Sequence, residues 1–241
     1  MGRGSSGKAS ANSEKSITLK DGTVIDLSEN PLEYGSNSHL DGDVKKRIEE
    51  FEAKRRDNLI EYGYAVDANG KVLEEKRGGK GSVSTSYMVL NNADVYTHVH
   101  PRDKGAKDLS GTFSEEDLRN WSMFNVRVFR ATGREGTYSI AKEKNFNASG
   151  ARQYFHEALK TLHKEFMARR KQIQEDYNKK STAIANGTGD YKSKRDAFDK
   201  AFKSANEQLS KAFNKELVGM HKAYINGQKK YGYSYSLERR K

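Results

Sequence analysis

The stretch DVYTHVHP, residues 94–101, decides how the central part of this chain folds. Its β-branched and aromatic residues predict a β-strand, and Pro101 ends it. Side chains two residues apart on a strand point to the same face, so His98 and His100 would bring both imidazoles within reach of one metal ion. A His-x-His pair alone is a weak signal, and its alternative is two polar residues on an edge strand.

The segments on either side of this stretch predict the rest of a sheet. Three predicted strands precede it, and a helix and two strands follow. In chain order they are LIEYGYAVD (59–67), KVLEEKRGG (71–79), SVSTSYMVL (82–90), the helix SEEDLRNWSMFN (114–125), NVRVFRAT (125–132) and GTYSIAK (136–142). The fold class is therefore predicted to be α+β, with a mixed β-sheet and flanking helices over residues 59–146.

The flanking regions are predicted to be of a different kind. Residues 1–16 have no apolar periodicity and are expected to be a disordered arm. Residues 17–58 should form a β-hairpin around Asp21-Gly22 and then a short amphipathic helix that leads into the core. Residues 147–228 repeat apolar side chains at helical spacing on both sides of a Gly-rich break, which predicts a long antiparallel helical hairpin with coiled-coil-like packing. Residues 229–241 are basic and aromatic and are expected to be a tail.

Composition limits the chemistry and the compartment. The chain has no cysteine, so a zinc site would have to be built from histidines and carboxylates. The absence of cysteine, of a long apolar run and of a signal peptide indicates a protein of the cytoplasm with no membrane partner. The net charge of +11 lies in the C-terminal part, where residues 151–241 hold 21 Lys and Arg against 10 Asp and Glu. This part could attract an acidic partner or nucleic acid, and Tyr231, Tyr233 and Tyr235 could stack bases. A solvated surface is the alternative.

A third ligand is needed to complete a metal site. Asp117 stands at the start of the helix that follows the His-x-His strand, where an inward carboxylate would give a His2Asp set with the fourth position left to water. The alternative is local: Ser114-x-x-Asp117 is also the pattern of a helix N-cap with an acidic N3 residue. The two interpretations are compatible, because Ser114 can cap the helix while its neighbourhood faces the ion.

Taken together, these residues resemble a known family. His98-x-His100-Pro101, then Ser114-x-x-Asp117, with Glu61 upstream on a strand, look like the JAB/JAMM (MPN-like) zinc metallopeptidases, over about a third of the chain. The resemblance implies the cytidine-deaminase-like layering of that family and one Zn²⁺ held by His98, His100 and Asp117. It also implies Glu61 as the general acid/base and Ser114 as the group that stabilises the oxyanion. Similar stand-alone prokaryotic and phage proteins carry this domain, so a phage or mobile-element origin is implied as well, in the bacterial host cytoplasm or the virion.

The segment between the histidines and the helix departs from the family. Residues 102–113 make a longer and more polar spacing than is usual there, which puts the substrate pocket in doubt more than the metal. Trp121 and Phe124, on the same helix as Asp117, are expected to pack it on the sheet, with substrate contact as the alternative. His156, His163 and His221 are expected to be ordinary helix residues.

Two classes of function follow. The first is a zinc-dependent peptidase or isopeptidase, whose protein or peptide substrate could be a ubiquitin-like conjugate or a peptidoglycan peptide. The second is a non-enzymatic phage or mobile-element protein, structural or nucleic-acid-binding, with the zinc domain as a scaffold. Hydrolysis of an amide by the first, or salt-sensitive binding of DNA or RNA by the second, would separate them.

Overall fold

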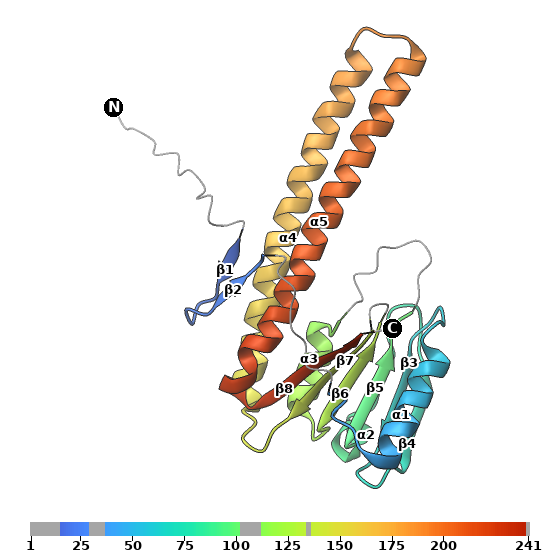
Figure 1. Cartoon of the computed structure of the whole chain (residues 1–241), viewed down its shortest axis with the longest axis vertical. Helices are drawn as coiled ribbons and strands as arrows, with labels where there is room; N and C mark the ends of the chain where they lie inside the picture. Colours follow the sequence, from blue (N-terminus) through green and yellow to red (C-terminus); the bar gives the residue numbers. More distant parts are fainter. Residues whose placement is uncertain (1–14, 29–36, 102–111, 134–135, 240–241) are drawn as a thin grey trace. The chain divides into compact units, whose positions relative to one another are not determined.

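The computed structural model describes residues 15–28, 37–101, 112–133 and 136–239 of the chain (Figure 1). The chain forms two compact units. One combines Met1–Asn30 with Lys160–Lys222, and the other combines Pro31–Leu159 with Ala223–Lys241. The predicted α+β class is confirmed at the level of a mixed six-stranded sheet with helices and a long helical hairpin.

The second unit is built on the six-stranded sheet. Its strands, in spatial order, are β4 (Val72–Arg77), β3 (Tyr62–Val66), β5 (Val95–Val99), β6 (Val128–Thr132), β7 (Gly136–Lys142) and β8 (Tyr233–Arg239). The β5 and β6 strands pair in parallel, and every other neighbouring pair is antiparallel. A parallel pair needs a crossover, and α3 (Glu115–Met123) lies in the connection between β5 and β6.

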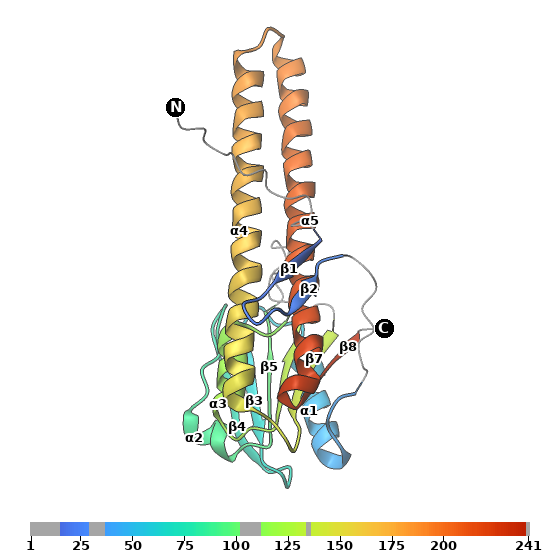
Figure 2. The ribbon, with the colours of Figure 1, turned by 90° about the vertical axis from the view of Figure 1, so that its left-hand side faces the viewer.

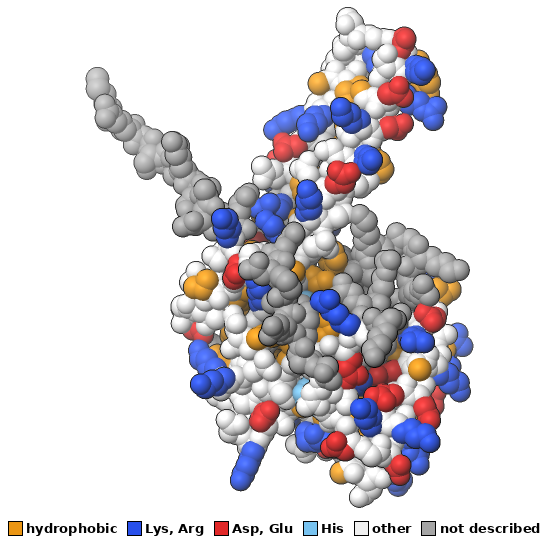
Figure 3. All heavy atoms as spheres, viewed as in Figure 1, with side chains coloured by type: hydrophobic (Ala, Val, Ile, Leu, Met, Phe, Trp, Pro, Cys, Tyr) orange, Lys and Arg blue, Asp and Glu red, His pale blue; other side chains and the backbone are white. Residues whose placement is uncertain are grey.

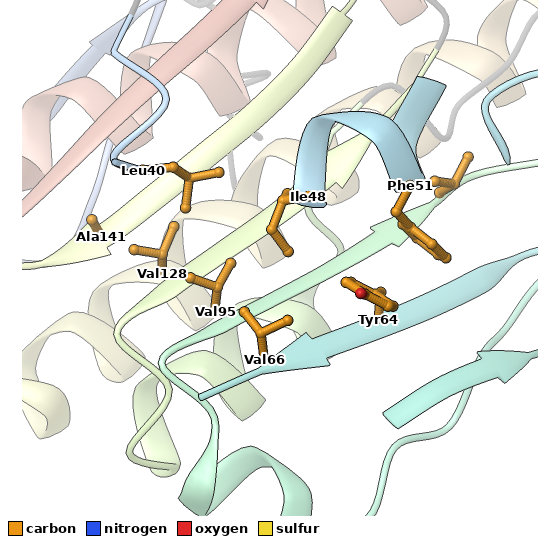
Figure 4. Packing of buried hydrophobic residues seen from close by; sticks show 9 residues of the cluster. Leu40, Ile48, Phe51, Tyr64, Val66, Val95, Val128 and Ala141 are labelled. Atoms are coloured by element: carbon orange, nitrogen blue, oxygen red, sulfur yellow. The ribbon is translucent and has the colours of Figure 1, made fainter. Parts of the chain in front are cut away.

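Helix α1 (Gly42–Arg55) covers one face of this sheet. Ile48 and Phe51 point from the helix onto the strands, and the Phe51 ring stacks on Tyr64 with centroids 4.6 Å apart (Figure 4). The valines of β3, β5 and β6 complete the cluster, so the predicted packing of this helix on the sheet is confirmed.

The opposite face of the sheet is aromatic. It packs against α3, the first turns of α4 (Ala148–Asn186) and the last turns of α5 (Tyr191–Tyr231). Trp121 is fully buried, and its ring lies 4.7 Å from that of Phe146 and 6.4 Å from that of Phe155, which confirms its packing role. This face also carries His98, so the aromatic core forms one wall of the candidate site.

The first unit contains a small hairpin and most of the two long helices. Strands β1 (Ser16–Thr18) and β2 (Val24–Asp26) pair around the predicted Asp-Gly turn, where Gly22 has a φ of 82°. Helices α4 and α5 form the predicted hairpin through residues 187–190 (Figure 2). Within this unit, Lys222 of α5 contacts the segment that follows β2, because its ammonium group donates a hydrogen bond to the Ser28 carbonyl at 2.9 Å. No helix in the described part of the chain is both long and apolar enough to cross a membrane.

The prediction of a C-terminal tail is wrong. Residues 229–231 end α5, Gly232 reverses the chain with a φ of 68°, and β8 then forms the edge of the sheet beside β7. Tyr231, Tyr233 and Tyr235 are 8%, 2% and 5% exposed, so they are core residues and cannot stack nucleic-acid bases.

Of two further expectations, one is wrong and the other lies mostly outside the described residues. Residues 82–90 were expected to form a strand, but the chain forms helix α2 (Tyr87–Asn92) after an irregular segment, because Ser86 caps it by accepting from the Val89 N–H. Residues 1–14 of the expected arm lie outside the described residues, and Ser16 opens β1.

Candidate metal centre

Strand pairing brings Glu61 and the two histidines to one face of the sheet. Gly63 on β3 pairs with His98 on β5, and Tyr62 pairs with Val99. Continued by one residue, this register sets Glu61 opposite His100. The Glu61 backbone exchanges hydrogen bonds with Gly78 and Gly79, which fixes its position although it lies just outside β3.

The N-terminus of α3 supplies the remaining two residues. The Ser114 hydroxyl accepts from the Asp117 N–H at 3.1 Å, and an Asp117 carboxylate oxygen accepts from the Ser114 N–H at 2.8 Å. The same oxygen also accepts from the Ser114 hydroxyl at 2.8 Å. The alternative interpretation of these two residues, a helix N-cap, is therefore confirmed: Ser114 and Asp117 form a capping box. This box also holds the Asp117 carboxylate in place beside the histidines.

The three predicted ligands come together. One donor atom each from His98, His100 and Asp117 lies within 4.8 Å of the other two. The His98 Nε2 and Asp117 Oδ2 atoms are 3.6 Å apart. In a tetrahedral zinc site, bonds of about 2.0–2.2 Å put ligand atoms roughly 3.3–3.6 Å from one another. Small side-chain rotations would therefore close these three groups around an ion. They are the one such cluster among the residues that the structure describes.

His100 has a buried nitrogen atom with no protein partner. Its Nε2 atom makes no hydrogen bond within the described structure, whereas the Nε2 atom of His98 faces Asp117. Buried polar atoms are nearly always satisfied, and each exception calls for an explanation such as an ion or a water. The donor set and the free His100 nitrogen fit a metal that prefers imidazole and carboxylate ligands.

Burial and the ion pair act in opposite directions on the charges of this cluster. For Asp117, burial disfavours the carboxylate, but the charge of His98, a hydrogen bond to it and the charge of His100 outweigh burial and lower the pKa. For His98, burial disfavours the imidazolium, yet the charge of Asp117 outweighs it and raises the pKa. The carboxylate thus favours a positive charge beside it, whether a proton on the imidazole or a cation.

Glu61 stands next to the cluster. Its Oε1 atom lies 3.8 Å from His100 Nδ1, and the residue is only 7% exposed. A carboxylate one water molecule away from a metal can accept and return a proton. The structure thus brings all five residues of the predicted constellation together, while residues 102–111 of the long connection lie outside the described residues.

Tyr96 lies beside His98 and is not among the site residues that the sequence predicts. Tyr96, two residues before His98 on the same face, has its ring 6.0 Å from the imidazole and accepts from the Thr85 hydroxyl at 3.0 Å. A side chain at Gly63 would meet this tyrosine, since its β-carbon would lie 2.7 Å from the Tyr96 hydroxyl. The period of two along the strand was the available signal for Tyr96.

The helix histidines form no comparable cluster in the described structure. His156 Nδ1 lies 2.5 Å from Glu115, and His163 Nδ1 lies 3.2 Å from Glu216, so each pairs with a single carboxylate. Both imidazoles are more than half exposed. These two are ordinary helix residues, as the sequence predicts, and they lie at the surface, whereas His221 of α5 is buried, at 2% exposure.

Comparisons of this chain with protein-family models, with curated proteins and with solved structures found no match.

Proposed function

We propose that this protein is a zinc-dependent hydrolase of the JAB/JAMM type that cleaves an amide bond in a protein or peptide. The observation that carries the proposal is the junction of β5, the start of α3 and the start of β3. There, two histidines and an aspartate gather their donor atoms within 4.8 Å, and Glu61 stands beside them.

His98, His100 and Asp117 would hold the ion. The fit rests on the buried His100 Nε2 atom, which lacks a protein partner, and on a donor set of two imidazoles and one carboxylate. When bound, zinc supplies Lewis acidity and makes a water molecule acidic enough to lose a proton near neutral pH. Three protein ligands leave a position open, which is typical of a catalytic rather than a structural zinc site.

Glu61 would move the protons. Its carboxylate accepts a proton from the attacking water and returns it to the leaving amine, which departs as a neutral group. The residue is suited to this work because its backbone is fixed by Gly78 and Gly79 while its side chain faces His100. A carboxylate at this place that was only solvated would not be buried to 7% exposure.

Ser114 would have two roles. It caps α3, and its hydroxyl group and backbone N–H hold Asp117. In the proposed reaction the hydroxyl also donates to the oxygen of the scissile carbonyl as negative charge develops there. The hydroxyl can do so by rotating away from Asp117, since the backbone N–H of Ser114 still holds that carboxylate.

A peptide library tests the proposal without a known substrate. The full chain, loaded with zinc, is incubated with peptides from a digested bacterial proteome, and newly formed amino termini are labelled and sequenced. New termini produced by the parent and not by Glu61→Gln support amide hydrolysis. Equal termini from both proteins, or none from the parent at any zinc concentration, would overturn it.

The second candidate is a binding protein that uses its basic part, and one observation keeps it open. Exposed lysines and arginines are spread over the helical hairpin, although acidic side chains stand among them (Figure 3). An acidic partner or nucleic acid would then bind through residues 151–241. Binding to DNA or RNA that weakens steeply with salt, in a protein that hydrolyses no peptide, would favour this function.

A further inference from the structure

Residues 81–93 form an uncharged segment in a highly charged protein. The segment reads GSVSTSYMVLNNA and has no Asp, Glu, Lys or Arg, whereas 32% of the whole chain is charged. Many of its side chains are exposed, so burial does not explain the absence of charge. The absence of charge, together with the exposed Tyr87 and Met88, fits a protein interface, in which acidic residues and lysine are depleted and aromatic and methionine residues are enriched.

This segment begins beside the candidate site. Its Val83 side chain would lie 3.2 Å from a β-carbon at Gly63, the residue that pairs with His98. Two residues later, Thr85 donates to the Tyr96 hydroxyl at 3.0 Å. The segment therefore runs alongside β5 in the opposite chain direction, from the proposed metal ligands toward the start of that strand.

The far end of the segment carries a cluster of exposed apolar side chains. The Tyr87 ring stacks on Phe124 with centroids 5.0 Å apart. Tyr87, Met88 and Met123 are 68%, 73% and 47% exposed. We call Tyr87, Met88, Met123 and Phe124 the distal patch.

The distal patch stands on a firm base. Leu90 of α2 is 2% exposed, and its carbonyl accepts from the Val126 N–H at 3.0 Å. A second link joins the Asn91 side chain to the Asn125 N–H at 3.3 Å. Helix α2 and the end of α3 are thus held together, so binding to the patch would cost little ordering of the protein. In Figure 1, α2 lies at the end of β5 away from its arrowhead.

We propose that residues 81–93 and the distal patch form the recognition surface for a protein substrate. That substrate would present an uncharged segment with a large apolar side chain at a fixed distance from the bond that is cut. This inference rests on the proposed function and adds a substrate class to it. Nucleic acid and an anionic membrane fit this surface less well, because residues 81–93 and the distal patch themselves carry no lysine or arginine.

The geometry sets the distance. Met123 follows Asp117 by six residues on α3, or about 9 Å at 1.5 Å per residue. An extended peptide advances about 3.3 Å per residue. A substrate bound along the segment would therefore place its apolar side chain roughly three residues from the scissile bond. Serines and threonines between the two sites can bond to the peptide backbone without selecting its side chains.

The test uses the zinc-loaded full chain and the proteome-derived peptide library. The variant is Tyr87→Ser with Met88→Ser and Met123→Ser, all at exposed positions. The matched control is Val24→Ser with Met167→Ser, which removes apolar side chains that are 55% and 42% exposed elsewhere in the chain. The parent and the control should cut peptides with an apolar residue about three positions from the bond. The patch variant should lose this preference and cut those peptides on the order of tenfold more slowly, with its zinc content unchanged.

An identical cleavage preference in parent and patch variant would overturn the inference while leaving the proposed function standing. If the parent cuts nothing, the surface is tested by binding instead, with random peptides displayed on phage and selected on the immobilised Glu61→Gln chain. Uncharged apolar peptides that no longer bind the patch variant would support the surface. No enrichment of such peptides would overturn it. A parent that is dimeric while the patch variant is monomeric would also overturn it, because a second copy would then cover the patch.

Discussion

Glu61 and His100 face each other across the antiparallel pair β3 and β5, with Glu61 Oε1 3.8 Å from His100 Nδ1. Glu61 directly precedes β3 and His100 directly follows β5. The pairing register therefore brings a buried carboxylate to the same place as the two imidazoles. The proposed proton carrier and one proposed metal ligand are adjacent because two strands, distant in sequence, pair in one particular register.

Replacing Glu61 with Gln should remove hydrolysis and leave the metal. The amide keeps the shape of the side chain but cannot carry the proton, so we expect turnover to fall by roughly 10²–10⁴-fold. Zinc content, measured by elemental analysis, should match that of the parent, since Glu61 is not one of the three ligands. Glu49→Gln, at an exposed position on α1, is the matched control. Parent-like turnover in Glu61→Gln would remove this residue from the mechanism.

Two substitutions of Ser114 should separate its capping role from its catalytic one. Ser114→Ala loses the cap and should lower the free energy of unfolding by about 1 kcal/mol, whereas Ser114→Gly should lower it by only a few tenths. Both remove the hydroxyl that would stabilise the oxyanion, so both should lower kcat by about 10²-fold or more. Urea unfolding and peptide turnover measure the two effects. If kcat followed stability and only the alanine variant were slow, Ser114 would be a cap alone.

Arg130 should be far more important for stability than Arg127. Arg130 is fully buried and binds both oxygens of Glu52, at 2.8 and 2.9 Å. Arg130→Met would leave that buried carboxylate without its partner, which should cost about 3–5 kcal/mol. Arg127 makes an equally short pair with Asp94, but its side chain is 48% exposed, so Arg127→Met should cost less than about 1 kcal/mol. Similar losses in the two variants on urea unfolding would contradict this view of the buried pair.

Acid should weaken the fold in part through His39. Burial, with the charges of Arg130 and Arg127, lowers the pKa of His39 from 6.5 to about 4. Between these values the unfolded chain binds a proton that the folded chain does not, so stability is full above about pH 6.5 and falls as the pH drops toward 4. The loss should be roughly 2 kcal/mol after allowance for partial exposure.

His39→Asn isolates this contribution. Asparagine tolerates the backbone φ of 57° at this position and does not titrate there. Urea unfolding of the parent and the variant near pH 7 and near pH 4.5 measures the difference. The difference in the free energy of unfolding between the parent and the variant should be smaller near pH 4.5 than near pH 7. If the parent and the variant lost the same stability on acidification, His39 would bind protons equally well in the folded and the unfolded chain, which would contradict this account.

Sequence patterns only a few residues long correctly predicted the elements that depend on interactions between near neighbours in the chain. The Asp21-Gly22 turn, the amphipathic helix α1, the capping box of α3 and the two long helices each depend on residues a few positions apart. The proposed metal ligands could be picked out for the same reason, since His98 and His100 share a face and Asp117 lies at a recognisable helix start. Their approach to one point depends on tertiary structure, which the family resemblance implied and no local pattern could derive.

The prediction of a C-terminal tail was wrong because the structure of that segment depends on residues far away in the sequence. Strand β8 pairs with β7 across about a hundred residues of sequence, so a short window shows only a polar tyrosine-rich end. Its alternation of Tyr233, Tyr235 and Leu237 with serines was nevertheless a period-two signal. Residues 82–90 are the converse case. Their Val, Thr and Tyr content favours a strand, but the serine cap turns the second half into helix α2.

The zinc content of the purified protein tests the central claim most directly. Elemental analysis is made after zinc reconstitution and gel filtration on the parent, on His98→Ala with His100→Ala, and on the helix control His163→Ala. We predict about one zinc per chain in the parent and in the control, and none in the double variant. A parent that holds no zinc after reconstitution, or a double variant that holds as much as the parent, would contradict the claim that these two histidines and Asp117 form a metal centre.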